Sequence, residues 1–428
     1  MTSKPILIYN LFPRLVGPMS RWPEHTARAA DMGFDWVYIN PIQYPGFSGS
    51  LYAVKDYYRL NPLFLDPDTA DPDGALADVL ATMHDQGLRV MIDLVINHTA
   101  KDSVLAEQHP AWFCHDEQGE LVSPSAIDPA DTRNVTVWGD LAELDHEGTS
   151  DRDGLWGFFT EVVQHMLDQG FDGFRCDAAY KVPPALWEVL VKKARQRKPG
   201  AVFAAETLGC RLDEVRRLDG VGLDYLFNSS KYWNFDATWA LEQHDEFGDV
   251  APSVAFPESH DTPRLMADTE GQVQVQKQRY AFAALFSAGL LMPVGYEYGF
   301  THKLDVVHTG PDQWEETGLD LSSFIREVNR LKASVPVLGE EGRWEVVTSL
   351  DGPTTVLCKR SRDRNPPALV AINKDWHQPQ TLTLPPLDGY LDGPARLIPL
   401  CRDEPIPRPL PSGEALILDP AEVALILE

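Results

Sequence analysis

Short apolar runs alternate with amphipathic helical stripes over most of the chain. Ile6–Tyr9 and Trp36–Ile39 are apolar runs of strand length. Between them, residues 22–32 carry a helical pattern, in which Pro23 suits the first turn and Gly33 the end. Strands that alternate with helices in this way predict an α/β fold built from successive βα units.

Eight strand predictions arise in this way, which is the number needed for a closed barrel. Leu76, Val79, Leu80 and Met83 recur at i, i+3, i+4 and i+7 and predict the helix before the third strand. The predicted strands are Ile6–Tyr9, Trp36–Ile39, Val90–Ile96, Phe171–Cys176, Ala201–Ala205, Val221–Phe227, Ser253–Phe256 and Leu290–Val294. We therefore predict a (β/α)8 TIM barrel, with a doubly wound parallel sheet as the structural alternative.

Two segments interrupt or replace the alternation. Residues 99–152 are rich in proline, glycine and polar side chains and are too long for an ordinary loop, so we predict a subdomain inserted after the third strand. From about residue 340, short runs separated by turn residues predict an antiparallel β-sandwich; they are Val346-Val347, Thr355–Leu357, Leu369–Ile372, Leu382–Leu384 and Ala415–Leu418. The predicted domains are the barrel at 1–98 and 153–338, the inserted subdomain at 99–152, and an all-β domain at 339–428.

Composition excludes several classes of protein. The 428 residues carry a formal net charge of -27, which disfavours binding to nucleic acid. No apolar run approaches the length of a membrane span, so no membrane partner is expected. The five cysteines are scattered, and none forms a CxxC pair, which argues against zinc and against a disulfide framework. With no signal-peptide pattern at the N-terminus, we expect a cytoplasmic protein; its oligomeric state does not follow from the sequence.

Acidic residues follow several of the predicted strands, where a barrel places its active groups. Asp177 ends the fourth strand two residues after Arg175, so both side chains point to one face and Arg175 could hold a carboxylate ionised. Glu206 follows small apolar residues, and burial there would raise its pKa and suit it to general acid catalysis. Asp261 beside His260 could stabilise positive charge at an anomeric carbon. Taken singly, each has a structural alternative, such as an ion pair or a helix cap.

In their order and spacing, these stretches resemble the α-amylase family, glycoside hydrolase family 13. The similarity lies in Asp93–His98 (DLVINH), Gly173–Asp177 (GFRCD), Glu206 and His260-Asp261, and it extends to the insertion and the C-terminal β domain. The resemblance implies that Asp177 is the nucleophile, Glu206 the acid/base and Asp261 the stabiliser. It further implies that the substrate-binding side chains at the cleavage point are those of Arg175, His98 and His260.

Other substrate-binding candidates lie where the chain departs from common family patterns. Tyr52, in a segment similar to one whose tyrosine stacks beneath the sugar, follows Ser50-Leu51 where many relatives have His-Gly. Lys181 ends the Tyr180-Lys181 pair, which replaces a Lys-His pair. Arg264, three residues after Asp261, could contact a terminal glucose or form a structural salt bridge. These departures concern acceptor and metal contacts more than the central carboxylates.

The same resemblance raises the question of calcium. In many amylases an asparagine matching Asn97 and an aspartate of the insertion, here Asp140, bind calcium through oxygen atoms. The histidine that often completes that site is absent from its expected position. The alternative is that both side chains only hydrogen-bond the insertion to the barrel, and no cofactor is required by the chemistry.

The residues and the resemblance together predict a retaining, α-glucan-active glycosidase that works through a covalent glycosyl-aspartate intermediate. The expected substrate is an α-glucan or a maltooligosaccharide. One alternative is a glycosyltransferase that passes maltosyl or glucosyl units to a sugar or to phosphate. Another is an inactive barrel that binds carbohydrate or a partner protein, although all three carboxylates are present.

Overall fold

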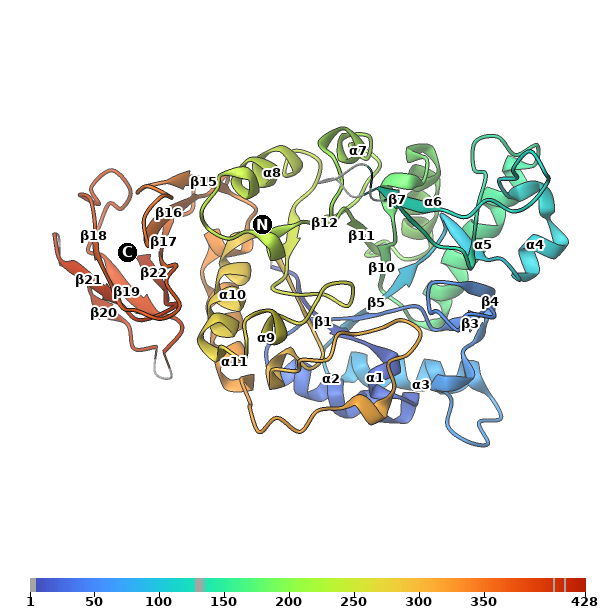
Figure 1. The fold of residues 1–428 in the computed structure, drawn as a ribbon, viewed down its shortest axis with the longest axis horizontal. Helices are drawn as coiled ribbons and strands as arrows, with labels where there is room; N and C mark the ends of the chain where they lie inside the picture. The colour runs from blue at the N-terminus through green and yellow to red at the C-terminus, as the bar shows by residue number, and fades with distance from the viewer. Residues whose placement is uncertain (1–4, 128–132, 134, 403–404, 412) are drawn as a thin grey trace.

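The computed structural model describes residues 5–127, 133, 135–402, 405–411 and 413–428. Residues 1–4, together with 128–132 and 134 of the predicted insertion, lie outside the described residues. Three parts of the chain follow one another along the longest axis: an insertion, a central barrel and a C-terminal β domain (Figure 1). None of the described helices combines the length and the apolar character needed to cross a bilayer.

The predicted barrel is confirmed as a closed ring of eight parallel strands, in the order β1-β14-β13-β12-β11-β10-β5-β2. The strand that closes the ring pairs directly with β1, with Tyr9 opposite Val37. Their bounds are β1 Leu7–Leu11, β2 Trp36–Ile39, β5 Arg89–Leu94, β10 Gly173–Cys176, β11 Val202–Glu206, β12 Tyr225–Phe227, β13 Ser253–Ala255 and β14 Gly289–Pro293. These strands are apolar runs rather than alternating patterns because a barrel strand is covered by helices outside and by packed side chains inside.

Helices surround the barrel and lie where the apolar stripes predict the longer ones. Leu76, Leu80 and Met83 are buried, and the helix that carries them is capped by the preceding Asp71, whose side chain accepts from the backbone N–H of Gly74 at 3.0 Å. The helices are α1 Pro13–Val16, α2 Trp22–Asp31, α3 Pro72–Asp85, α5 Arg152–Gln169, α6 Pro184–Arg197, α7 Leu212–Arg216, α8 Trp239–Phe247, α9 Leu265–Asp268, α10 Val273–Phe286 and α11 Ser322–Ser334.

Among the barrel strands, β12 differs most from its predicted bounds. The sequence predicts a strand over Val221–Phe227, but β12 begins only at Tyr225. Gly220 and Gly222 both have positive φ, at 77° and 93°, so the chain is still turning where the strand was expected.

The insertion leaves the barrel after β5 and is made of short antiparallel pairs. Its elements are β6 His98–Ala100, α4 Val104–Gln108, β7 Ser125–Ile127, β8 Val135–Val137 and β9 Leu141–Glu143. The β6–β9 pair anchors it to the barrel, with His98 opposite Glu143. A hairpin that the sequence pattern did not predict, β3 Gln43–Pro45 with β4 Val54–Leu60, lies against β6.

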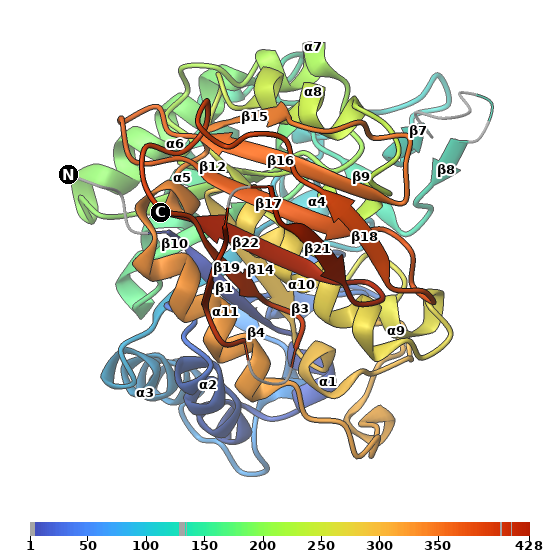
Figure 2. The same cartoon turned by 90° about the vertical axis from the view of Figure 1, so that its left-hand side faces the viewer.

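The C-terminal region is all-β, as predicted, and packs one face of its larger sheet on the barrel (Figure 2). In β16 and β17, alternate residues join different cores: Leu357 and Val370 belong to the barrel core, whereas Val356 and Leu369 face the small two-stranded sheet β18-β21. The strands are β15 Arg343–Val346, β16 Thr354–Arg360, β17 Ala368–Asn373, β18 Gln380–Thr383, β19 Arg396–Pro399, β20 Arg408–Pro409, β21 Ala415–Leu418 and β22 Val423–Leu427. β19 and β22 lie outside the predicted runs, yet β22 pairs between β17 and β19 near the middle of the sheet.

Candidate active site

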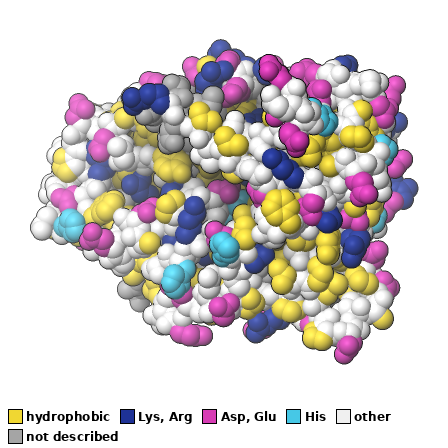
Figure 3. All heavy atoms as spheres, turned by 45° about the vertical axis from the view of Figure 1, so that its right-hand side comes forward, with side chains coloured by type: hydrophobic (Ala, Val, Ile, Leu, Met, Phe, Trp, Pro, Cys, Tyr) yellow, Lys and Arg dark blue, Asp and Glu magenta, His cyan; other side chains and the backbone are white. Residues whose placement is uncertain are grey.

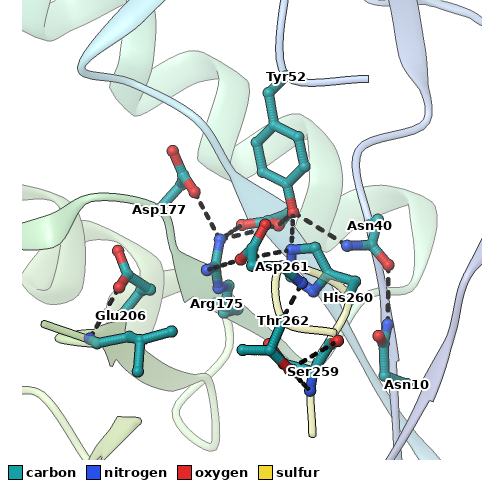
Figure 4. A network of polar contacts seen from close by, with 12 residues as sticks. Asn10, Asn40, Tyr52, Arg175, Asp177, Glu206, Ser259, His260, Asp261 and Thr262 are labelled. Atoms are coloured by element: carbon teal, nitrogen blue, oxygen red, sulfur yellow. Dashed lines mark hydrogen bonds and ion pairs between the residues drawn. The ribbon is translucent and has the colours of Figure 1, made fainter. Parts of the chain in front are cut away.

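The carboxyl ends of four barrel strands bring a group of charged side chains together. Asp93 lies on β5, Arg175 on β10, and Asp177 directly after it, while Glu206 ends β11 and Asp261 follows β13. Figure 4 shows the carboxyl groups of Asp177, Glu206 and Asp261 arranged around Arg175. Strand order explains the meeting, since β5, β10 and β11 are neighbours in the ring, β13 is separated from β11 by β12 alone, and all the carboxyl ends open at one mouth.

Arg175 is the cation at the centre of this group. It lies directly opposite Asp93 in the β10–β5 register, and its Nη1 donates to both Asp93 oxygens at 3.1 Å. The same nitrogen donates to Asp177 Oδ1 at 2.6 Å, and Nη2 lies 3.8 Å from Asp261 Oδ2. Burial works against the charge of Arg175, but the surrounding groups, Asp93 first, raise its pKa well above the ordinary value. One guanidinium therefore partly neutralises the negative charge of three carboxylates.

Asp177 is nearly buried at a sharp turn of the chain. The next residue, Ala178, has a positive φ of 42°, a left-handed conformation in which a non-glycine residue is strained. Burial raises the pKa of Asp177, and the hydrogen bond and charge of Arg175 oppose that rise. The predicted Arg175–Asp177 contact is therefore present, and it favours the ionised carboxylate that a nucleophile needs.

Glu206 has a different environment, although it belongs to the same group. The described hydrogen bond to its carboxyl comes from the backbone N–H of Leu208, at 2.8 Å, and no described cation pairs with it. Burial raises its pKa to about 7, while the charge of Arg175 opposes the rise and those of Asp177 and Asp261 add to it. A carboxyl with that pKa is available in its protonated form near neutral pH, as a general acid must be.

Asp261 is the most exposed of the three carboxylates, with 49% of its side chain accessible. Its Oδ2 lies 3.1 Å from Nε2 of His260. Burial works against ionisation, yet His260 and Arg175 together hold the pKa of Asp261 well below its ordinary value. Asp261 therefore remains an anion and can face positive charge that develops on a substrate.

Tyr52 and His260 form one wall of the site. Their rings are parallel to within 6°, with centroids 5.8 Å apart, and Tyr52 keeps part of its surface exposed. The Tyr52 hydroxyl donates its single proton to Asp93 Oδ2 at 2.6 Å. Nε2 of His260 lies 2.7 Å from the Tyr52 hydroxyl oxygen. Because the hydroxyl proton is already used, Nε2 must be the donor in the contact between His260 and Tyr52. The partly exposed ring of Tyr52 is the predicted platform for a sugar.

Four positioning residues were not predicted as site residues: Asp93, Tyr38, Asn40 and Asn10. Asp93 was noted as part of a motif without a role, and it accepts from Tyr38 Oη as well as Tyr52 Oη, each at 2.6 Å. Asn40 donates to the Tyr52 hydroxyl at 3.0 Å and is itself held by Asn10. One sequence signal could have found Asp93: a lone carboxylate in an otherwise apolar barrel strand requires a cation, and Arg175 lies on a strand of the same barrel.

His98 and Lys181 lie near the group without direct contacts to the three carboxylates. Burial lowers the pKa of His98 to about 4, so its ring is neutral, and its buried Nε2 has no partner among the described residues. The Lys181 ammonium donates to the carbonyl of Ser125 on β7 and lies 5.3 Å from the centre of the Trp138 ring. Lys181 therefore joins the segment after β10 to the insertion, and its contact with substrate remains a prediction.

Arg264 does not lie among the substrate-facing residues. It is almost fully buried, and it donates to Glu258 Oε1 at 2.8 Å and to the carbonyls of Val294 and His302 at 2.9 and 3.1 Å. The proposed contact with a terminal glucose is therefore corrected. The structural salt bridge that the sequence left open is the arrangement found, because the buried Glu258 carboxylate requires a cation.

The candidate calcium ligands, Asn97 and Asp140, each have other contacts among the described residues. Asn97 Nδ2 lies 3.4 Å from Nδ1 of His98, and Asp140 is half-buried in the insertion, where its carbonyl accepts from Lys101. Calcium takes six to eight oxygen ligands, and among the described residues no group of three or more acidic, histidine or cysteine side chains could hold a metal. Calcium therefore stays a prediction from the resemblance and enters no step below.

The fold and this site define a class: (β/α)8 proteins with three carboxylates gathered at the carboxyl end of the barrel. Comparison with known proteins confirms the resemblance to the α-amylase family. Residues 1–118 match the family model described as "Glycogen debranching enzyme, glucanotransferase domain". An α-amylase from Lactobacillus plantarum has the same fold, with a TM-score of 0.76 and 21% identity over 99% of both chains.

Two curated relatives extend the similarity along the chain. Alpha-1,4-glucan:maltose-1-phosphate maltosyltransferase from Burkholderia pseudomallei (strain K96243) is 28% identical over 398 residues, which cover 89% of this chain and 34% of that protein. A cyclomaltodextrinase from Bacillus sp is 23% identical over 376 residues, 82% of this chain and 64% of that protein. The chain thus spans about a third of one relative and somewhat less than two thirds of the other.

Proposed function

We propose that the chain is a retaining, α-glucan-active glycosidase that cleaves α-glucosidic bonds through a covalent intermediate on Asp177. The observation that carries the proposal is the difference between two carboxyls of one group. Arg175 donates directly to Asp177, whereas Glu206 has no described cation partner and a pKa of about 7. A retaining glycosidase needs this division into one ionised and one protonated carboxyl. The similarity to glucan-active proteins supports the substrate class.

In the first step, Glu206 protonates the glycosidic oxygen while a carboxylate oxygen of Asp177 attacks the anomeric carbon. The bond to the leaving sugar breaks as the Asp177 ester forms, and Glu206 is left ionised. Arg175 fixes the orientation of Asp177 through its 2.6 Å hydrogen bond. Asp261 stays ionised and stabilises the positive charge that develops on the sugar ring in the transition state.

In the second step, Glu206 acts as a base. It takes a proton from the acceptor, whose oxygen attacks the anomeric carbon and releases Asp177. With water as acceptor the reaction is hydrolysis; with a sugar hydroxyl or phosphate it is glycosyl transfer. Transfer is the second candidate function, and similarity to a maltosyltransferase over 89% of the chain favours it.

Incubation with maltoheptaose tests both the chemistry and the choice of acceptor. Asp177→Asn should lower the turnover rate by at least about 10³-fold, because the substituted amide cannot form the glycosyl ester. An unchanged thermal unfolding midpoint would show that the fold of this variant is intact. Substantial turnover by Asp177→Asn would refute the proposed mechanism. Inactivity of both proteins would favour the binding-only barrel. Products longer than seven glucose units would indicate transfer.

The remaining expectations concern partners and location. Acidic and basic side chains are interspersed on the face shown in Figure 3. An extended basic surface for nucleic acid is not evident on that face, and the net charge of -27 opposes such binding. A cytoplasmic location remains a prediction from the sequence.

A further inference from the structure

A second hollow lies beside the barrel and shares none of its lining residues with the catalytic group. It has a volume of about 680 Å³, within the range of small-molecule sites, and lies between α1, α2 and the connection from β14 to α11. Leu15 and Val16 of α1 line it, whereas Phe12, just before α1, stacks on His260. The hollow is therefore near the catalytic group but separate from it; we call it the α2 cleft.

Aromatic rings form one side of the α2 cleft. Trp314 is half-buried, packed edge-on against Phe300, with ring centroids 5.1 Å apart and an angle of 89°. Tyr298 and His25 lie beside it, with their centroids 6.0 and 5.2 Å from that of Trp314. Burial, followed by the charges of Arg28 and Arg21, lowers the pKa of His25 to about 4, so its ring is neutral. These supporting contacts hold the Trp314 ring in place within the lining of the cleft.

Hydrogen-bonding groups lie next to these rings. Nη2 of Arg28 is used by Tyr9, His25 and Glu297, and its guanidinium lies 5.1 Å from the centre of the Tyr298 ring. Nε of Arg28 is buried and has no hydrogen-bond partner among the described residues, and no hydrogen bond of the Trp314 indole N–H is described. The exposed carboxylates of Glu24 and Asp320 line the same cleft and supply acceptors. The cleft thus offers donors and acceptors side by side.

This combination fits a neutral compound with many hydroxyl groups. Each hydroxyl both donates and accepts, so it can bond an Arg28 or Trp314 N–H and a carboxylate together. The C–H face of a sugar ring is apolar and packs against an aromatic face. The carboxylates that line the cleft outnumber its arginines and disfavour an anionic ligand; they are Glu24, Glu315, Glu316 and Asp320, against Arg21 and Arg28. We infer that the α2 cleft is a second binding site for a glucan chain, distinct from the catalytic group; the identity of the sugar rests on the proposed function.

The test is the number of sugars bound by the full-length Asp177→Asn protein, titrated with maltoheptaose by calorimetry. The expected result is two binding sites per chain. Adding Trp314→Ala should leave one site, and adding Glu24→Ala, an exposed change with little effect on packing, should weaken the second site about tenfold. Tyr58→Ala is the matched control, because Tyr58 is a partly exposed aromatic that lines neither site; it should keep both sites.

One site per chain in the Asp177→Asn protein would overturn the inference, as would two unchanged sites in both cleft variants. Turnover of maltoheptaose by the unsubstituted protein separates this failure from failure of the proposed function. Turnover together with a single binding site would remove only the α2 cleft, whereas no turnover would remove the catalytic proposal whatever the number of sites.

Discussion

The protonation of Glu206 gives the most direct quantitative prediction. If its pKa were the ordinary 4.5, only about one molecule in 300 would carry the proton at pH 7, whereas the pKa of about 7 leaves about half protonated. The rise corresponds to about 3 kcal/mol in favour of the protonated form. Because the acid must be protonated in the first step, kcat/KM should fall as pH rises through about 7, by about tenfold per pH unit above it.

The assay is kcat/KM for maltoheptaose from pH 5 to 9, with products measured by chromatography. On the acidic side activity should also fall, because Asp177 must be ionised and its pKa lies above the ordinary value. Glu206→Gln should lose about 10³-fold with maltoheptaose but much less with maltosyl fluoride, whose leaving group needs little protonation. A profile that is flat between pH 6 and 9, or a basic decline that persists in Glu206→Gln, would refute the assignment of Glu206 as acid.

Three further substitutions probe the support of the site and the fold. Asp93→Asn removes the carboxylate that positions Arg175 and Tyr52, and should lower kcat about 10²-fold with a smaller change in KM. A change of that size in KM, with kcat unaltered, would contradict this role. Arg264→Ala leaves the buried Glu258 carboxylate unpaired and should lower the free energy of unfolding by about 3–5 kcal/mol, measured by denaturant titration; the double variant Arg264→Ala with Glu258→Gln should recover part of that loss. Leu425→Ala in β22 should lower the free energy of unfolding by about 2–5 kcal/mol, because the side chain is fully buried against the barrel core. An unchanged unfolding midpoint would argue against that packing.

Hydrophobic periodicity predicted the barrel because its strands are buried on both faces and its helices on one. Periodicity did not give the correct start of β12, and it did not reveal β22. Gly220 and Gly222 turn the chain through residues assigned to a strand, and β22 was overlooked although Val423–Leu427 is a continuous apolar run. That strand contacts the barrel with one face and the small sheet with the other, so its continuous apolar run is of the same kind as those that predicted the barrel strands and could have been recognised.

The site was partly predictable for a similar reason. The positions of Asp177 and Glu206 at strand ends follow from the barrel itself, since these ends meet at one mouth. The direction of a loop side chain does not follow from the sequence, and Arg264 turns toward Glu258 and two backbone carbonyls instead of the open site. The lone carboxylate of Asp93 in an apolar strand indicates that it needs a cation, but its pairing with Arg175 depends on strand register, which no local pattern reveals.

Because Asp93, Asp177 and Asp261 share a single guanidinium, their titrations are coupled. Removing a proton from any one of these three alters the field felt by the other two, so an acidic step in a pH–rate profile belongs to the three together, whereas the basic step follows Glu206, which has no described cation partner. Any redesign of the specificity of this protein would accordingly have to keep Arg175 and the acids around it unchanged as a group.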